Sequence, residues 1–233
     1  ANSTAKLSKI KGSSLFQQIL DHFCEEIKSG LYFHEDFKVD KFKLYPASKL
    51  NHLLTKEYTY LPLYKRVDKL KSLLQQQVKR QKDEMLKKIT DHYDGKIEKG
   101  LNFKGDERKR KAYISEVLKR KDVRLTAFKD ELRNAVPRYI RLVKKSSTFT
   151  HYKDLFSNPE RMSDYAGGAL TLEVAADLCA YSQQIFAKKK YEIEDLGPLL
   201  YLHAKLYGVH PDHRAKNVVI VEAQDYSFMQ IAA

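Results

Sequence analysis

The sequence is poor in the residues that support disulfide, redox or membrane structure. Its 233 residues include only 2 cysteines, Cys24 and Cys179, which lie far apart and form no Cys-x-x-Cys pair. Two such thiols are by default reduced and partly buried. No apolar run approaches the ~20 residues that a membrane-spanning helix needs, and no charged-then-apolar leader opens the chain. The sequence therefore predicts a cytoplasmic protein without a membrane contact.

A phosphate-binding loop is also missing. Such a loop is a glycine-rich turn ending in Gly-Lys-Ser/Thr, whose backbone amides and lysine hold the phosphates. The only Gly-Lys pair is Gly95-Lys96, which is followed by Ile97 and has no glycine at the required upstream spacing. We interpret this pair as a turn, and we expect no ATP hydrolysis by this chain alone.

Metal ligands are scarce as well. His203, His210 and His213 are the densest group of histidines, but a structural zinc site needs four ligands in fixed geometry. Gly208 and Pro211 place the last two histidines in a loop, and no cysteine pair accompanies them. The sequence predicts no metal site here.

Positive charge is what the sequence has in excess, with 43 Lys and Arg against 30 Asp and Glu and a net charge of +13. Two segments hold this whole excess. The segment from Leu61 to Asp94 contains nine basic and five acidic side chains, and the segment from Lys104 to Lys145 contains fifteen basic and six acidic ones. The function is therefore to be sought first between residues 61 and 145.

Both basic segments have the apolar spacing of long helices. The spacings of three, four and seven residues are those of a coiled-coil seam. In the first segment the seam residues are Leu63, Val67, Leu70, Leu74, Val78, Met85 and Ile89. In the second they are Tyr113, Val117, Leu125, Phe128, Leu132, Val136, Ile140 and Val143.

Proline and glycine punctuate these helices. Pro62 suits the first turn of the first helix, and Pro137 predicts a kink in the second. The glycines at 95, 100 and 105 predict that the chain reverses within residues 94–105. These patterns predict a basic antiparallel hairpin over 61–145. Its arm should have a length on the order of 45 Å, since each helix has ~30 residues.

The rest of the chain predicts a mainly helical frame. A short strand pair or an extended segment is expected over Phe37–Leu44, and a short connecting helix over Pro46–Tyr58. Further helices are expected over Phe149–Phe156 and Thr171–Lys190.

The hairpin's cations suit the neutralisation of phosphates, which gives salt-dependent and sequence-independent affinity. A solvated helix face has the same composition, so both interpretations stay open. Stacking on unpaired bases needs aromatic side chains among positive charges, and Tyr139 is the candidate, since the seam spacing assigns Tyr113 and Phe128 to packing. The candidate contact residues are Arg108, Lys109, Arg110, Lys111, Lys119, Arg120, Lys121, Arg138, Tyr139 and Arg141.

The most specific motif lies near the end of the sequence, where it reads Val218-Val219-Ile220-Val221-Glu222-Ala223-Gln224-Asp225-Tyr226-Ser227. A continuously apolar run of this kind is typical of a buried parallel strand, which delivers carboxylates at its C-terminal end. A short buried strand before a polar turn would also begin this way. The string from Glu222 to Ser227 is more specific than that alternative.

This string resembles the DEAQD signature of superfamily 1 helicases, with Val221 in place of the first aspartate. The acidic and then leucine-rich stretch from Tyr191 to Gly208 precedes it, as in UvrD/Rep-like proteins. The similarity is greatest to the HelD (helicase IV-like) branch, and Ile10–Phe16 resembles the lead-in to that branch's helical insertion. The resemblance covers roughly residues 190–230 well and the remainder loosely.

The resemblance implies a mainly α fold in two parts. Residues 1–165 would be a helical inserted (1B-like) domain with the hairpin 61–145. Residues 166–233 would be an incomplete α/β, RecA-like (1A) segment ending at the Walker B strand. The chain would then be an internal piece of an ATP-dependent helicase-like hydrolase that uses ATP and Mg²⁺.

The resemblance also implies roles for individual residues. Glu222 would be the catalytic carboxylate, while Gln224 and Asp225 would couple hydrolysis to movement. Val221 occupies the position expected of the Mg²⁺ ligand and cannot ligate a metal ion. Implied partners are DNA or RNA backbone and bacterial RNA polymerase. The alternative is a non-catalytic basic coiled-coil module that binds nucleic acid or the polymerase.

The apolar strand itself carries a further expectation. Most strands that would pair with Val218–Val221 are missing from this sequence, and an apolar strand with open edges promotes association. We expect this strand to pair with another copy of the chain, to pack on the helices, or to be poorly ordered.

Overall fold

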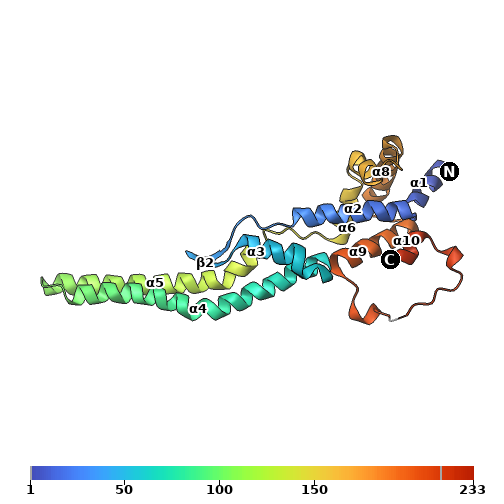
Figure 1. The fold of residues 1–233 in the computed structure, drawn as a ribbon. Coiled ribbons are helices and arrows are strands. Elements are labelled where there is room, and N and C mark those ends of the chain that lie inside the picture. Colours follow the sequence, from blue (N-terminus) through green and yellow to red (C-terminus); the bar gives the residue numbers. More distant parts are fainter. Residues whose placement is uncertain (1, 216) are drawn as a thin grey trace. The chain divides into compact units, whose positions relative to one another are not determined.

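A computed structural model describes residues 2–215 and 217–233, with side chains from residue 6 onward. The described chain is mainly helical, as the sequence predicts (Figure 1). The α-helices are α1 (Asn2–Lys11), α2 (Ser14–Gly30), α3 (Ala47–His52), α4 (Leu63–Leu101), α5 (Glu107–Ile140), α6 (Thr148–Leu155), α7 (Pro159–Tyr165), α8 (Leu172–Ala187), α9 (Leu196–Tyr207) and α10 (Phe228–Ala232). Single turns are a π-helical one at Leu53–Glu57 and 3-10 ones at Tyr58–Tyr60, Ile193–Asp195, Pro211–His213 and Ala223–Asp225.

The chain divides into two compact units. The core unit combines Ala1–Tyr32, Thr59–Arg66 and Lys144–Ala233, and the hairpin unit combines Phe33–Tyr58 and Val67–Val143. The predicted boundary at residue 165 falls inside the core unit. The assignment of these units to helicase domains stays a prediction.

The core unit is built around α2. The side chain of Ser13 accepts a hydrogen bond from the amide of Phe16 and so caps the start of this helix. The helix then buries one face, with Phe16, Ile19 and Leu20 fully inaccessible. The Phe16 ring packs on the rings of Tyr152 and Phe156 at centroid distances of 6.4 and 5.9 Å, which joins α2 to α6.

Buried charge fixes α1 against the turn Ile193–Asp195. Lys11 is fully buried, and its Nζ lies 2.8 Å from Oδ1 of Asp195 and 3.0 Å from Oε2 of Glu192. The Tyr152 hydroxyl donates to the same Asp195 oxygen at 2.8 Å, and the Tyr181 hydroxyl donates to Glu192. Burial and the Asp195 charge raise the pKa of Tyr152 well above its ordinary value. Because each buried charge has partners, this network positions the helices that contribute to it.

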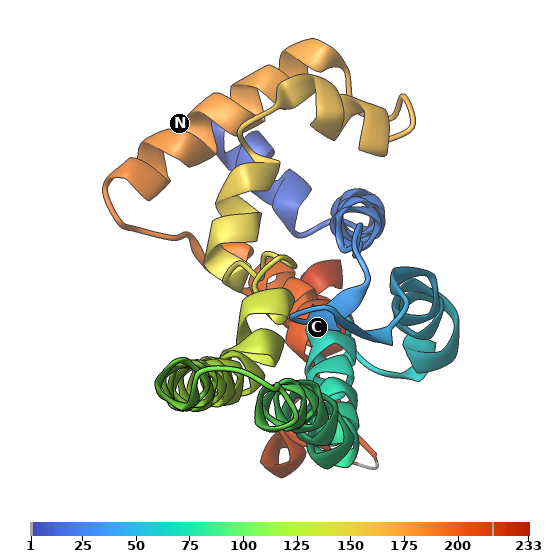
Figure 2. The same cartoon turned by 90° about the vertical axis from the view of Figure 1, so that its left-hand side faces the viewer.

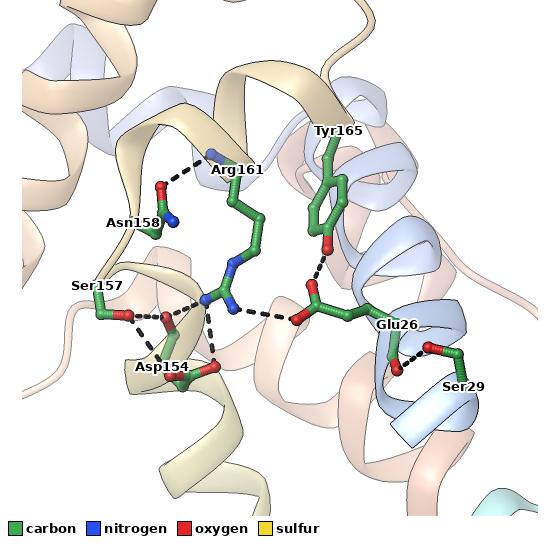
Figure 3. Close-up of polar contacts among 7 residues, drawn as sticks. All are labelled: Glu26, Ser29, Asp154, Ser157, Asn158, Arg161 and Tyr165. Atoms are coloured by element: carbon green, nitrogen blue, oxygen red, sulfur yellow. Dashed lines mark hydrogen bonds and ion pairs between the residues drawn. The ribbon is translucent and has the colours of Figure 1, made fainter. Parts of the chain in front are cut away.

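A second polar cluster joins α2, α6 and α7 (Figure 3). Arg161 lies between two carboxylates, with Nη1 3.3 Å from Oε1 of Glu26 and Nη2 3.2 Å from Oδ2 of Asp154. The Tyr165 hydroxyl donates to the other oxygen of Glu26, and the Asn158 side chain caps α7 by accepting from the Arg161 amide at 3.0 Å. The arginine therefore holds three helices together.

The hairpin unit consists of α3, α4 from Val67 onward, α5 and a small sheet. Figures 1 and 2 show α4 and α5 side by side along the arm. The predicted seam is largely confirmed, since these members are buried: Val67, Leu70, Leu74, Met85, Ile89, Val117, Phe128, Leu132, Val136 and Val143. The helices have 39 and 34 residues, so they span roughly 50–60 Å, more than the sequence predicts.

The chain reverses later than the glycines predict. Gly95 and Gly100 lie within α4, and the reversal occupies 102–106, where the Asp106 side chain caps α5 by accepting from the Arg108 amide at 2.9 Å. A helical glycine costs only about 1 kcal/mol, which the packing of a long hairpin outweighs. The expectation of a reversal beginning at residue 94 was wrong.

Of the two alternatives expected here, the strand pair is the one present, as the antiparallel strands β1 (Phe37–Val39) and β2 (Phe42–Tyr45). Asp40 takes a positive φ of 54° in the tight turn between them. The predicted helices around 149–156 and 171–190 are present as α6 and α8. Cys24 and Cys179 are both free, and burial raises the pKa values of these thiols to about 12 and about 11.

The predicted RecA-like strand is not formed. Val218–Val221 has no strand structure, and Val219 is 86% exposed. Figure 1 shows 217–221 as part of an extended connection between α9 and α10. A strand needs a neighbour to pair its amide and carbonyl groups, and within the described residues β1 and β2 pair only with each other. The expectation of an α/β segment at 166–233 was therefore wrong for this chain, while self-association through Val218–Val221 stays a prediction.

Candidate nucleic-acid interface

The positive side chains of α5 are mostly exposed. Arg108 and Lys109 on the first turn and Lys119 further along are exposed, and Arg110 is half-buried. None of these four side chains has a carboxylate partner within the described part of the chain. Their charges are therefore available to an external anion.

Other predicted contact residues are paired within the hairpin unit. Lys111 pairs with Glu107 at 2.8 Å and Arg120 with Glu116 at 2.7 Å, both one turn apart on the exposed face of α5. Such exposed pairs stabilise a protein by roughly 0–1 kcal/mol, so an anion can replace the carboxylate.

Three further predicted contacts differ in their surroundings. Lys121 is only 19% exposed and pairs with Asp94 of α4 at 2.6 Å, which connects the two helices. Arg138 pairs with Glu131 at 2.7 Å, and Arg141 is exposed just beyond α5.

Tyr139 is not available for stacking on a base. Its side chain is 8% exposed, and its ring is stacked on Phe33 at 5.0 Å with an interplanar angle of 3°. Its hydroxyl donates to the carbonyl of Glu35 at 2.5 Å. Burial raises the pKa of Tyr139 to about 12. The prediction of a stacking role was wrong because this tyrosine fastens α5 to the segment before β1.

Tyr113 is also placed differently from the prediction. Its side chain is 47% exposed near the end of the hairpin, whereas Phe128 is fully buried as predicted. The heptad spacing assigned both residues to the seam. Near the ends of the two helices, however, seam positions are less buried.

A cationic groove lies between α4 and α5 that the sequence reasoning missed. Its volume is about 350 Å³, and Val78, Leu132, Val136 and Pro137 supply its apolar lining. Four cations line it as well: Lys79, Lys82, Lys129 and Arg133. The available signal was that Lys79, Lys129 and Arg133 each directly follow a seam residue in the sequence, which places them along the edges of the interface between the helices.

The helicase-like string lies on the surface of the core unit. Glu222 has a left-handed backbone with φ of 55°, and Gln224 and Asp225 follow in a 3-10 turn; all three are exposed. Ser227 and Gln230 then form a capping box that starts α10. The string therefore links a loop to a short helix.

The acidic residues of this string lie on the surface. The side chain of Val221 offers no ligand atom, and the neighbouring Glu222 and Asp225 are on an exposed turn. Within the described residues no group of three or more His, Cys, Asp or Glu side chains could hold a metal ion. ATP and Mg²⁺ stay a prediction for the intact parent.

Comparison with protein-family models, with curated proteins and with solved structures gave no match. No described helix has both the length and the apolar character needed to cross a membrane. The resemblance to HelD-like helicases therefore stays a prediction from the sequence, and the hairpin stays a candidate interface.

Proposed function

We propose that the chain is part of a superfamily 1 helicase-like ATPase of the HelD-like kind, in which the hairpin α4–α5 contacts the phosphate backbone of DNA or RNA. One observation carries the proposal of contact. Arg108, Lys109, Arg110 and Lys119 are accessible on a long two-helix arm and have no carboxylate partner among the described residues.

Unpaired cations on a packed arm suit a polyanion. When a lysine or arginine neutralises a phosphate, condensed counterions are released, and log K falls with log salt by about 0.9 per contact on duplex DNA and about 0.7 on single strands. The rigid seam of α4 and α5 holds these cations in place. Affinity should therefore be strong at low salt and independent of sequence.

The test is a salt titration of nucleic-acid binding. The variant Arg108→Gln, Lys109→Gln, Arg110→Gln, Lys119→Gln should bind a labelled oligonucleotide more weakly and should reduce the salt slope by about 3–4. The matched control removes four cations from the core unit: Lys28→Gln, Lys153→Gln, Lys188→Gln, Lys190→Gln. Equal losses in both variants, or no binding by the unmodified chain, would contradict the proposal.

The role proposed for Glu222 requires a longer parent protein with a phosphate loop, and it is tested in that protein. Glu222→Gln should abolish nucleotide hydrolysis if this carboxylate orients the attacking water. Val221→Asp should raise the hydrolysis rate by restoring a metal ligand. If neither change alters hydrolysis, the string has no catalytic role.

A second candidate function is a non-catalytic module that binds RNA polymerase. The favouring observation is that Leu118 and Val123 are 45% and 70% exposed on α5, among its cations. Apolar side chains add little to phosphate binding but contribute to protein contacts. The double variant Leu118→Ser, Val123→Ser should weaken capture of purified polymerase and leave oligonucleotide binding unchanged.

A further inference from the structure

The tip of the hairpin contains a pocket of about 380 Å³. The last turns of α4 and the reversal contribute Lys99, Gly100 and Phe103. The first turns of α5 contribute Lys109, Arg110 and Tyr113. Its volume falls in the range of roughly 300–1,000 Å³ that is typical of small-ligand sites.

Two aromatic rings line this pocket and are accessible. Phe103 is 61% exposed and Tyr113 is 47% exposed. Neither ring packs against another aromatic ring within the described residues. The two rings share one pocket and do not stack on each other, so neither ring covers the other, and both are partly open to solvent.

Glycines set the position of both rings. A Cβ atom at residue 100 would lie 2.9 Å from Cδ1 of Tyr113, and one at residue 105 would lie 2.3 Å from Cε1 of Phe103. Only the missing side chain lets each ring lie this close to the backbone. Gly100 keeps a helical conformation in α4, so its role is close contact and not a turn.

The rim of the pocket is positively charged. Lys99, Lys109 and Arg110 line it, and none of the three has an ion-pair partner among the described residues. Aromatic rings among lysines and arginines are the combination that binds single strands, because bases stack on the rings and phosphates lie on the cations. An apolar peptide would find complementary rings here but not a complementary charge.

We propose that the hairpin tip binds an unpaired base of a single-stranded nucleic acid, with the base stacked on Phe103 and Tyr113 and the adjoining phosphates on Lys99, Lys109 and Arg110. This inference rests on the proposed function and deepens it, because phosphate contact along the arm alone would not distinguish single strands from duplexes. The base is recognised by its flat face, so DNA and RNA both offer the required chemistry.

The experiment compares two labelled oligonucleotides of equal length and charge, one with thymine bases and one with abasic sites. The full chain should bind the base-bearing oligonucleotide about tenfold more tightly. Phe103→Ala and Tyr113→Ala should each remove most of this preference and leave abasic binding unchanged. Tyr113→Phe should retain the preference because it keeps the ring. Matching RNA oligonucleotides should give the same pattern.

Phe149→Ala is the matched control, since this ring is also half-exposed but belongs to the core unit. Equal binding of base-bearing and abasic strands would overturn the tip proposal while leaving phosphate contact intact. So would an equal loss for both strands in Phe103→Ala, or a base preference lost in Phe149→Ala. The proposal would also be overturned if the tip bound an apolar peptide in place of the base, with Phe103→Ala and Tyr113→Ala weakening that binding. Absence of binding to either strand would instead refute the proposed function itself.

Discussion

In the core unit Lys11 is fully buried between Asp195 and Glu192, whereas Lys109 and Arg110 of the hairpin unit have no carboxylate partner among the described residues. The same charged group therefore has two uses. In the core unit it holds segments of the chain together. In the hairpin unit Lys109 and Arg110 stay available for an external partner, and α4 and α5 pack mainly through one apolar seam.

The difference is one of solvation. A buried ion pair loses the hydration of both charges and depends on the attraction and hydrogen bonds of its partners. An exposed cation keeps its hydration and loses counterions only when a polyanion arrives. Substitution of Lys11 should therefore lower the stability of the core unit, whereas substitution of the exposed cations should weaken binding by the hairpin unit.

The largest expected effect comes from breaking the buried pair. Lys11→Met should lower the free energy of unfolding by about 3–5 kcal/mol, because two carboxylates would stay in the core without their cation. Urea titration followed by far-ultraviolet circular dichroism measures it. Lys28→Met is the control, since Lys28 and its partner Glu25 are accessible and their pair is worth no more than about 1 kcal/mol. Similar losses in both variants would contradict the comparison.

The next effect tests the seam of the hairpin. Leu74→Ala should cost about 2–4 kcal/mol, since Leu74 is fully buried and its removal leaves a cavity. Leu118→Ala, at a 45% exposed position on α5, should cost less than about 1 kcal/mol. Hydrogen exchange of hairpin amides locates the loss. If Leu118→Ala cost as much as Leu74→Ala, the hairpin would not rest on its seam.

A smaller effect separates two glycines of α4. Gly95 has open space where a Cβ would lie, so Gly95→Ala should stabilise the helix by about 0.5–1 kcal/mol. Gly100→Ala gains the same helix propensity, but its new Cβ displaces the Tyr113 ring, so the variant should gain less stability. Its binding preference for base-bearing strands over abasic strands should also fall. Thermal melts and anisotropy measure the two properties. Identical behaviour of the two variants would contradict the role of Gly100.

The smallest expected effect depends on pH. Burial lowers the pKa of His151, although the Asp154 charge opposes the shift, and the Tyr64 hydroxyl lies 2.5 Å from Nε2. The folded protein thus favours neutral His151, while the unfolded chain takes up a proton at about pH 6.5. Stability should fall as the pH drops below about 6.5. His151→Gln should flatten this slope between about pH 7 and about pH 5, and the exposed His52→Gln should not.

Apolar periodicity predicted much of this fold. The spacing of Leu70, Leu74 and Phe128 identified the hairpin, because one buried seam leaves a regular pattern. The apolar residues Phe37, Val39 and Leu44 likewise indicated a strand pair or an extended segment, and the structure has the strand pair. Glycine positions were less informative, since Gly95 and Gly100 are tolerated inside a helix whose packing outweighs their cost.

The site was predicted less well than the fold. Local composition indicated the cations of α5, yet it could not distinguish the buried Tyr139 from the accessible Tyr113, because that depends on which segment packs over each. Phe103 gave no periodic signal because it lies in the reversal. The prediction of a strand at Val218–Val221 was wrong for a related reason, because strand pairing depends on neighbouring strands that one segment does not specify.

The contact between Lys11 and Glu192 joins residues 181 positions apart, which has a consequence for folding during synthesis. The hairpin unit is complete once residue 143 has emerged, and its helices and seam form from nearby segments of the chain. The core unit must wait until the turn at Ile193–Asp195 has been made, because its first helix has no ionic partner before then. We therefore expect the arm to be folded on the ribosome while Lys11 is still hydrated.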